Sequence, residues 1–229
     1  MANFGFSHLT VVAPYEPHWR EAKSAVGASD LLQNAQRTES LAEAVADCTL
    51  VVGTGTLEHR KPEQTVVALP DLAPRINMEL VRGGRIALVF GPEKRGLTRD
   101  DLALCHLLVE IPTDPRQPSM NLGQAVAVCL YELATRTLLS SAETIESTAS
   151  SGANSTAPAS PGDSACARDL DLVAEVVEAT MEAANYSPAA MQKANRHDLD
   201  LLLRRLELTQ PDARRILGLF RRILWRLKR

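Results

Sequence analysis

The sequence lacks the features that define several common protein classes. None of its apolar runs approaches the roughly 20 residues that a membrane span needs. No basic segment followed by an apolar one opens the chain, which predicts a cytoplasmic protein without a membrane anchor. A Gly-x-x-x-x-Gly-Lys-Ser/Thr loop and a Gly-x-Gly-x-x-Gly loop after a strand are both missing, which argues against a nucleotide triphosphatase and a dinucleotide-dependent oxidoreductase.

Cysteine and histidine are few and scattered. The four cysteines form no Cys-x-x-Cys pair and three lie in apolar segments, so buried reduced thiols are favoured over disulfides or zinc. The five histidines show no paired spacing, so no metal site is expected. With 45% hydrophobic residues, the 229-residue chain is long enough for one α/β domain and a small appendage.

Charge is distributed unevenly along the chain. Residues 193–229 hold eleven Lys or Arg against four acids, a net of +7, so the whole-chain charge of −3 leaves −10 for residues 1–192. A basic tail on an acidic body is typical of proteins that bind a polyanion. The alternative is that the charges only solvate the outer face of an amphipathic helix, and charge alone does not decide between the two.

Short apolar segments rich in β-branched residues alternate with segments of helical spacing. This alternation predicts an α/β fold with a mostly parallel sheet and helices on both faces. The expected strands are residues 8–13, 49–53, 85–90 and 107–111. The expected helices before residue 140 are residues 18–26, 40–47, 71–82, a short one opened by Thr98, and 121–139.

Residues 140–166 are dominated by Ser, Thr, Ala, Gly, Pro and Asn, which predicts a flexible linker. Beyond it, three amphipathic helices are expected, over 167–184, after Ser187-Pro188, and after Thr209. The predicted domains are therefore residues 1–139, a linker over 140–166, and a basic helical domain over 167–229.

The stretch 86–98, Ile-Ala-Leu-Val-Phe-Gly-Pro-Glu-Lys-Arg-Gly-Leu-Thr, is the most informative part of the chain. A buried strand ends on Gly91-Pro92, and the loop after it carries Glu93, Lys94 and Arg95. A second passage from strand through loop to helix runs from Val109 to Ala125 and contains Ser-Met-Asn-Leu-Gly-Gln-Ala. In this order and at this spacing, the two passages resemble signature motifs of the SpoU branch of the SPOUT RNA methyltransferases.

The resemblance covers about residues 1–139 and implies a C-terminal trefoil knot, a homodimer and S-adenosyl-L-methionine bound in the knot. The last sixty residues look like the helical extension of the tRNA subgroup that methylates a ribose in the anticodon loop. The Gly-Thr-Gly-Thr run at 53–56 follows a third expected strand. Each glycine alone reads as an ordinary turn, whereas the three loops together favour a pocket for the cofactor's adenosine.

Carried over by position, the resemblance implies two sets of site residues. The expected cofactor contacts are Thr54, Gly55, Thr56, Gly91, Ile111, Pro118, Ser119 and Met120. The residues expected on the RNA-facing, catalytic side are Glu93, Arg95 and Asn121. Glu93 would orient polar groups near the ribose and Asn121 would start the last helix, while Arg95 is also readable as a surface arginine that touches phosphate.

One departure from the family pattern concerns its first motif, an Asn followed six residues later by an Arg and closed by a Met. Met1 matches that closing Met, so the motif's Asn and Arg do not occur in this sequence. A start codon placed about 25 residues too late is the simpler explanation, and a true truncation is the alternative.

The prediction is thus an enzyme that methylates the ribose 2′-oxygen of RNA, with tRNA favoured over rRNA and cytidine or uridine at nucleotide 32 as the target. The alternative is a catalytically silent, knotted RNA-binding dimer that lacks the first-motif Arg.

Overall fold

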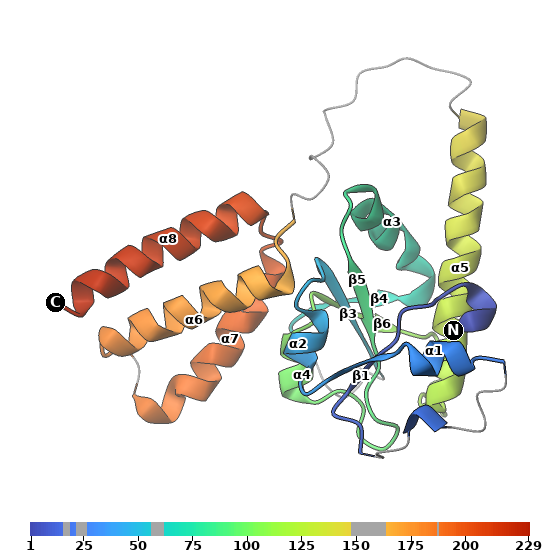
Figure 1. The fold of residues 1–229 in the computed structure, drawn as a ribbon, viewed down its shortest axis with the longest axis horizontal. Coiled ribbons are helices and arrows are strands. Elements are labelled where there is room, and N and C mark those ends of the chain that lie inside the picture. Colours follow the sequence, from blue (N-terminus) through green and yellow to red (C-terminus); the bar gives the residue numbers. More distant parts are fainter. Residues whose placement is uncertain (16–18, 22–26, 56–61, 148–163, 187) are drawn as a thin grey trace.

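The structure is a computed structural model that describes residues 1–15, 19–21, 27–55, 62–147, 164–186 and 188–229. Its centre is a four-stranded sheet in the order β4-β6-β3-β5, and every strand pair in it is parallel (Figure 1). The strands are β3 (Leu50–Thr54), β4 (Thr65–Ala68), β5 (Ile86–Val89) and β6 (Leu107–Glu110). The predicted parallel α/β architecture is confirmed.

Helices cover both faces of this sheet because alternate residues of each strand point to opposite sides. Val51 and Leu108 belong to a buried cluster with α2 (Leu41–Val45) and α4 (Arg99–Ala103). Their neighbours Val52, Leu107 and Val109 belong to a second cluster that includes residues of α3 (Ala73–Val81) and α5 (Leu122–Ser147). The core is therefore two apolar layers with the sheet between them.

A second, two-stranded parallel sheet lies near the N-terminus and pairs β1 (Thr10–Val12) with β2 (Gln36–Thr38). Strand β1 was predicted from the sequence, whereas β2, β4 and the short helix α1 (Ser29–Gln33) were not. Single 3₁₀ turns also occur at Ala2–Phe4, Trp19–Glu21, Leu69–Asp71 and Ala189–Met191. Of the helix expected over 18–26, residues 19–21 form one of these 3₁₀ turns, and residues 22–26 lie outside the described part of the chain.

Side-chain caps fix where several helices begin. The Ser40 hydroxyl accepts from the Glu43 N–H before α2. Thr98 and Asp101 form a reciprocal capping box before α4, which directs the chain out of the loop that carries Glu93. Pro74 falls in the first turn of α3, where its missing N–H costs nothing.

Helix α5 is longer than predicted. It ends at Ser147 rather than at 139, so the first eight residues of the expected linker are helical. Alanine, threonine and serine in this stretch are compatible with either state, and the helix already begun at Leu122 extends through them at the low cost of propagation. Residues 148–163, the rest of that linker up to Asp163, lie outside the described part of the chain.

Three further helices follow Ser164: α6 (Ala167–Ala183), α7 (Gln192–Arg205) and α8 (Gln210–Leu227). They share an apolar cluster that includes the buried residues Leu170 of α6, Leu203 of α7 and Ala213 of α8. Helix α6 also contacts the segment between α2 and β3, since the backbone N–H of Ala167 donates to the Cys48 carbonyl at 2.9 Å. Figure 1 shows α8 running beside α6 and away from the sheet.

Candidate functional site

Three loops open at one edge of the central sheet. They follow β6, β3 and β5, which are neighbours in the sheet and parallel, so their carboxyl ends lie side by side. This is the edge at which open α/β sheets bind ligands. The fold thus brings together the three segments that sequence analysis selected from separate parts of the chain.

The first loop leaves β3 at Thr54, which is half-buried. The Thr54 hydroxyl donates to the Val89 carbonyl at 2.9 Å and so ties the end of β3 to the end of β5. Gly55 follows and is exposed. Thr56, the third cofactor contact expected here, lies outside the described residues.

The second loop folds back on itself around Gly91. A Cβ atom on Gly91 would lie 2.2 Å from the carbonyl carbon of Gly96, a distance that no real side chain tolerates. The turn is closed by the Gly96 N–H, which donates to the Pro92 carbonyl at 2.8 Å, and Gly96 itself has a φ of 63°. Gly91 was predicted from the sequence as a cofactor contact. The structure shows that the fold of the loop itself already requires glycine at this position.

The third loop leads from β6 to α5. Ile111 packs against the core, the Pro118 carbonyl accepts from the Thr113 hydroxyl at 3.3 Å, and Ser119 is exposed beside half-buried Met120. This internal hydrogen bond joins the two ends of the loop, which brings the contact residues predicted at its start and at its end near each other.

An ion pair in that loop was not predicted from the sequence. Both Arg116 Nη2 and the Arg116 backbone N–H donate to the Asp114 carboxylate, at 2.7 and 2.9 Å. These hydrogen bonds lower the pKa of Asp114. The sequence signal for it was the Asp-Pro-Arg spacing, which places a cation two residues after an acid across a proline.

Two of the three residues expected on the catalytic side touch each other. The Asn121 side-chain amide donates to the Glu93 carboxylate at 2.6 Å. The same side chain accepts from the Gly123 N–H at 2.9 Å and so begins helix α5. Arg95 is exposed in the Glu93 loop, where its backbone N–H donates to the Pro92 carbonyl at 3.2 Å.

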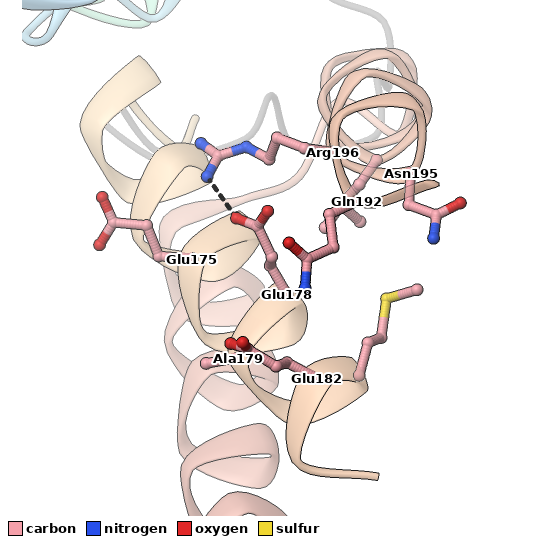
Figure 2. A pocket seen from close by; sticks show the side chains of 9 residues that line it. Glu175, Glu178, Ala179, Glu182, Gln192, Asn195 and Arg196 are labelled. Carbon is pink, nitrogen blue, oxygen red and sulfur yellow. Dashed lines mark hydrogen bonds and ion pairs between the residues drawn. The ribbon is translucent and has the colours of Figure 1, made fainter. Parts of the chain in front are cut away.

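Two cavities lie away from these loops and contain none of the predicted site residues. One, of about 200 Å³, lies between α6 and α7, where Glu178 points toward Arg196 (Figure 2), and its lining also includes Glu175, Glu182 and Gln192. Arg196 and Glu178 form an ion pair at 3.2 Å, which neutralises part of the negative charge of the glutamates. The other, of about 640 Å³, lies at the amino ends of the strands and is bordered by α3 and α7.

Buried polar groups line the second cavity. Arg204 is only 1% exposed and donates to the Asp171 carboxylate at 2.9 Å, and among the residues that the structure describes its Nε–H has no acceptor. The His106 ring accepts from the Val51 N–H at 3.0 Å, and burial next to Arg204 lowers the pKa of His106 to about 3. This cavity is distinct in place and chemistry from the loop site at the opposite edge.

Within the part of the chain that the structure describes, no cluster of three His, Cys, Asp or Glu side chains is arranged to hold a metal ion. Over the same residues, no helix combines the length and apolar character needed to cross a membrane.

Comparisons with known proteins point to one family. Residues 1–131 match the SpoU rRNA Methylase family. The tRNA (cytidine/uridine/adenosine-2′-O-)-methyltransferase TrmJ of Pseudomonas aeruginosa is 38% identical over 134 residues, which cover 58% of this chain and 52% of that one. The Klebsiella pneumoniae tRNA (cytidine/uridine-2′-O-)-methyltransferase TrmJ is 40% identical over 138 residues, 58% of this chain and 54% of that one. The chain spans about half the length of these curated relatives.

Solved structures extend the likeness to the helices after residue 164. The crystal structure of TrmJ from Z. mobilis ZM4 has a TM-score of 0.78 and 26% identity, and the match covers 97% of this chain and 89% of that one. A probable methylase family protein from Haemophilus influenzae has a TM-score of 0.58 and 25% identity, over 99% and 87% of the two chains. Since the family match covers more than half of its residues, the chain belongs to the SpoU rRNA Methylase family.

Proposed function

We propose that this protein is an S-adenosyl-L-methionine-dependent ribose 2′-O-methyltransferase that acts on the tRNA anticodon loop, at cytidine or uridine in nucleotide 32. The observation that carries the proposal is the meeting of three motif loops at one sheet edge, with Glu93 and Asn121 hydrogen-bonded across two of them. The relatives named as tRNA 2′-O-methyltransferases support the substrate class.

The residues present fit the proposed cofactor. Its expected contacts, Thr54, Gly55, Gly91, Ile111 and the segment 118–120, offer backbone groups, hydroxyls and apolar side chains and no charge. Such a set suits an uncharged adenosine, which is held by backbone hydrogen bonds and apolar contact. When bound, S-adenosylmethionine supplies an electrophilic methyl group on a sulfonium that is already a good leaving group.

The chain's own residues would mainly position the reacting groups. Asn121 holds the Glu93 carboxylate in one orientation, and Glu93 would then accept a hydrogen bond from a ribose hydroxyl beside the pocket. Arg95, exposed in the same loop, would contact a neighbouring phosphate. In this proposal the protein contributes orientation and exclusion of water rather than a covalent intermediate.

The proposal includes a trefoil knot at the third loop, a separate basic helical domain over 167–229, a cytoplasmic location and a homodimer. Support for a dimer comes from the exposed apolar residues of α5, among which Val128 is 37% and Tyr131 is 57% exposed. In contrast, Cys129, Leu130 and Leu133 of the same helix are already buried within one chain. A monomer in sedimentation at micromolar concentration would contradict the dimer.

The test of the reaction is transfer of a tritiated methyl group to tRNA transcripts. We expect incorporation into a transcript with a 2′-hydroxyl at nucleotide 32 and none when that residue is a 2′-deoxynucleotide. Equal labelling of both transcripts would reject nucleotide 32, and stronger labelling of ribosomal RNA fragments would assign the enzyme to rRNA instead.

The alternative function is a catalytically silent RNA-binding protein. The genomic sequence just upstream of Met1 separates the two. An in-frame Asn-x-x-x-x-x-Arg there supports the enzyme, and an in-frame stop codon supports the silent protein. Tight binding of tRNA with no methyl transfer by the full-length protein would establish the silent function.

A further inference from the structure

One face of helix α8 is packed and the opposite face is basic. Ala213 is buried, and Ile216, Leu217 and Phe220 pack against the cluster that α8 shares with α6. The exposed side carries all seven basic residues of the helix and of the two residues after it, Arg214, Arg215, Arg221, Arg222, Arg226, Lys228 and Arg229.

Most of this positive charge is not neutralised by the protein. Arg215 pairs with Asp212 at 2.9 Å. For the other six basic residues, no carboxylate lies within ion-pair distance among the residues that the structure describes. Other basic residues of the C-terminal segment are used internally: Lys193 pairs with Asp100, Arg196 with Glu178 and Arg204 with Asp171. The free charge of the segment is therefore concentrated on α8.

An exposed tryptophan stands in the middle of this basic face. Successive helix residues turn by about 100°, so Trp225 projects on the same side as Arg221, four residues before it, and Arg229, four residues after it. The Trp225 ring lies 3.8 Å below the Arg229 guanidinium and the residue is still 51% exposed. A flat ring framed by arginines is the arrangement that stacks nucleic-acid bases while cations hold the phosphates.

Gly218 falls on the same face, seven residues before Trp225. A Cβ atom built on Gly218 would have nothing within 4 Å, so packing does not require glycine there. Glycine in a helix interior costs about 1 kcal/mol relative to alanine. It leaves a bare stretch of backbone between Arg214 and Arg221, which gives a ligand room to approach the helix closely.

The position of Trp225 distinguishes this face from a membrane-binding helix. A helix that lies on a lipid surface places tryptophan among its apolar residues. Here the exposed apolar residues Ile223 and Leu227 stand two positions from Trp225, a turn of about 200°, and so project from the opposite side. The aromatic ring shares its face with cations and not with apolar side chains.

We propose that Trp225 is a stacking platform for an unpaired RNA base, and that Arg221, Arg222 and Arg229 hold the phosphates on either side of that base. The partner is single-stranded RNA, such as a loop, because bases in a duplex are already stacked on each other. The inference rests on the proposed function only in taking RNA as the partner, and it adds a binding site far along the chain from the motif loops.

The experiment uses the whole chain with Trp19→Phe, which leaves Trp225 as the only tryptophan. We expect an eight-nucleotide single-stranded RNA to quench Trp225 fluorescence and the matching duplex to leave it nearly unchanged. In anisotropy titrations, Trp225→Ala should weaken single-strand binding about 5- to 100-fold, whereas Trp225→Phe should retain affinity within a few-fold.

Salt dependence separates stacking from charge. Arg222→Gln should lower the slope of log affinity against log salt by about 0.7, the value for one phosphate contact on a single strand. Trp225→Ala should lower affinity at every salt concentration without changing that slope. An unchanged single-strand affinity in Trp225→Ala overturns the proposal, and so does tighter binding of the chain to anionic phosphatidylserine vesicles than to RNA.

The measurement needs no methyl donor. A chain that fails to transfer methyl groups but loses RNA affinity with Trp225→Ala would disprove the proposed function and leave this site standing. If the Trp225→Ala variant methylates tRNA as well as the wild type does, the proposed function is supported and this site is disproved.

Discussion

The Asn121 amide donates to the Glu93 carboxylate at 2.6 Å, although the two residues lie 28 positions apart on different loops. The Asn121 oxygen is meanwhile fixed by the backbone N–H of Gly123 at 2.9 Å. Because the oxygen must face the helix backbone, the amide nitrogen can only point toward Glu93. The start of α5 thus sets the orientation of the carboxylate in the neighbouring loop.

Replacing Asn121 with Asp should separate these two roles. Aspartate caps a helix as well as asparagine does, so we expect the free energy of unfolding in urea to change by less than about 1 kcal/mol. The new carboxylate would repel Glu93 and move it, and methyl transfer should fall on the order of 100-fold. The double variant Asn121→Asp with Glu93→Gln restores a donor–acceptor pair, and methyl transfer should recover in part. Wild-type transfer by the single variant would contradict this role for the pair.

Gly91 should tolerate no side chain. In Gly91→Ala the Cβ would meet the backbone of Gly96, so the loop must move. We expect a loss of about 1–3 kcal/mol in unfolding free energy and loss of S-adenosylhomocysteine binding in calorimetry. A bulky residue at Gly55 should also abolish binding. If both variants keep full affinity, the cofactor site lies elsewhere.

Gly218 is the matched control for this test. Since nothing surrounds a Cβ at that position, Gly218→Ala should stabilise α8 by about 1 kcal/mol. Thermal melting of the two alanine variants should therefore shift in opposite directions.

His106 should make the fold less stable in acid. Its pKa is lowered to about 3 in the folded chain, below the usual 6.5, so the unfolded chain binds a proton that the folded one does not. Stability from this group is complete above pH 6.5 and is lost as the pH falls toward 3, at up to about 1.4 kcal/mol per pH unit. Urea unfolding at pH 7.5 and 5.5 measures the loss.

The control for His106 is His106→Asn, whose side-chain oxygen can replace the ring nitrogen that accepts from Val51. We expect a smaller drop in stability between pH 7.5 and 5.5 for this variant than for the wild type. An equal drop in both proteins would assign the acid sensitivity to other groups.

Arg204 should be far more important for stability than its neighbour Arg205. Removing the buried Arg204 guanidinium leaves Asp171 without its 2.9 Å partner, and breaking such a pair costs about 3–5 kcal/mol. Arg205 is exposed and has no ion pair among the described residues, so Arg205→Ala should stay within about 0.5 kcal/mol. Comparable unfolding midpoints for the two alanine variants would show that the buried pair contributes little.

Local sequence determined much of this fold. Hydrophobic runs predicted β3, β5 and β6, and the caps at Thr98 and Thr209 predicted where their helices start. These signals are carried by residues within a few positions of each other, so they are readable without the fold. The two long motifs also selected the loops that the structure gathers at one edge of the sheet.

Tertiary structure decided the rest. The polar strand β2 exists because it pairs with β1 some 26 positions earlier, and no local pattern marks it. Arg204 counted as part of a basic tail in the sequence, but packing of α7 buries it against Asp171. Trp225 of α8, in contrast, is exposed among arginines. Composition gives the number of charges, whereas only the fold determines which are neutralised inside and which remain free to meet a partner, because ion pairing depends on distances that the sequence does not contain.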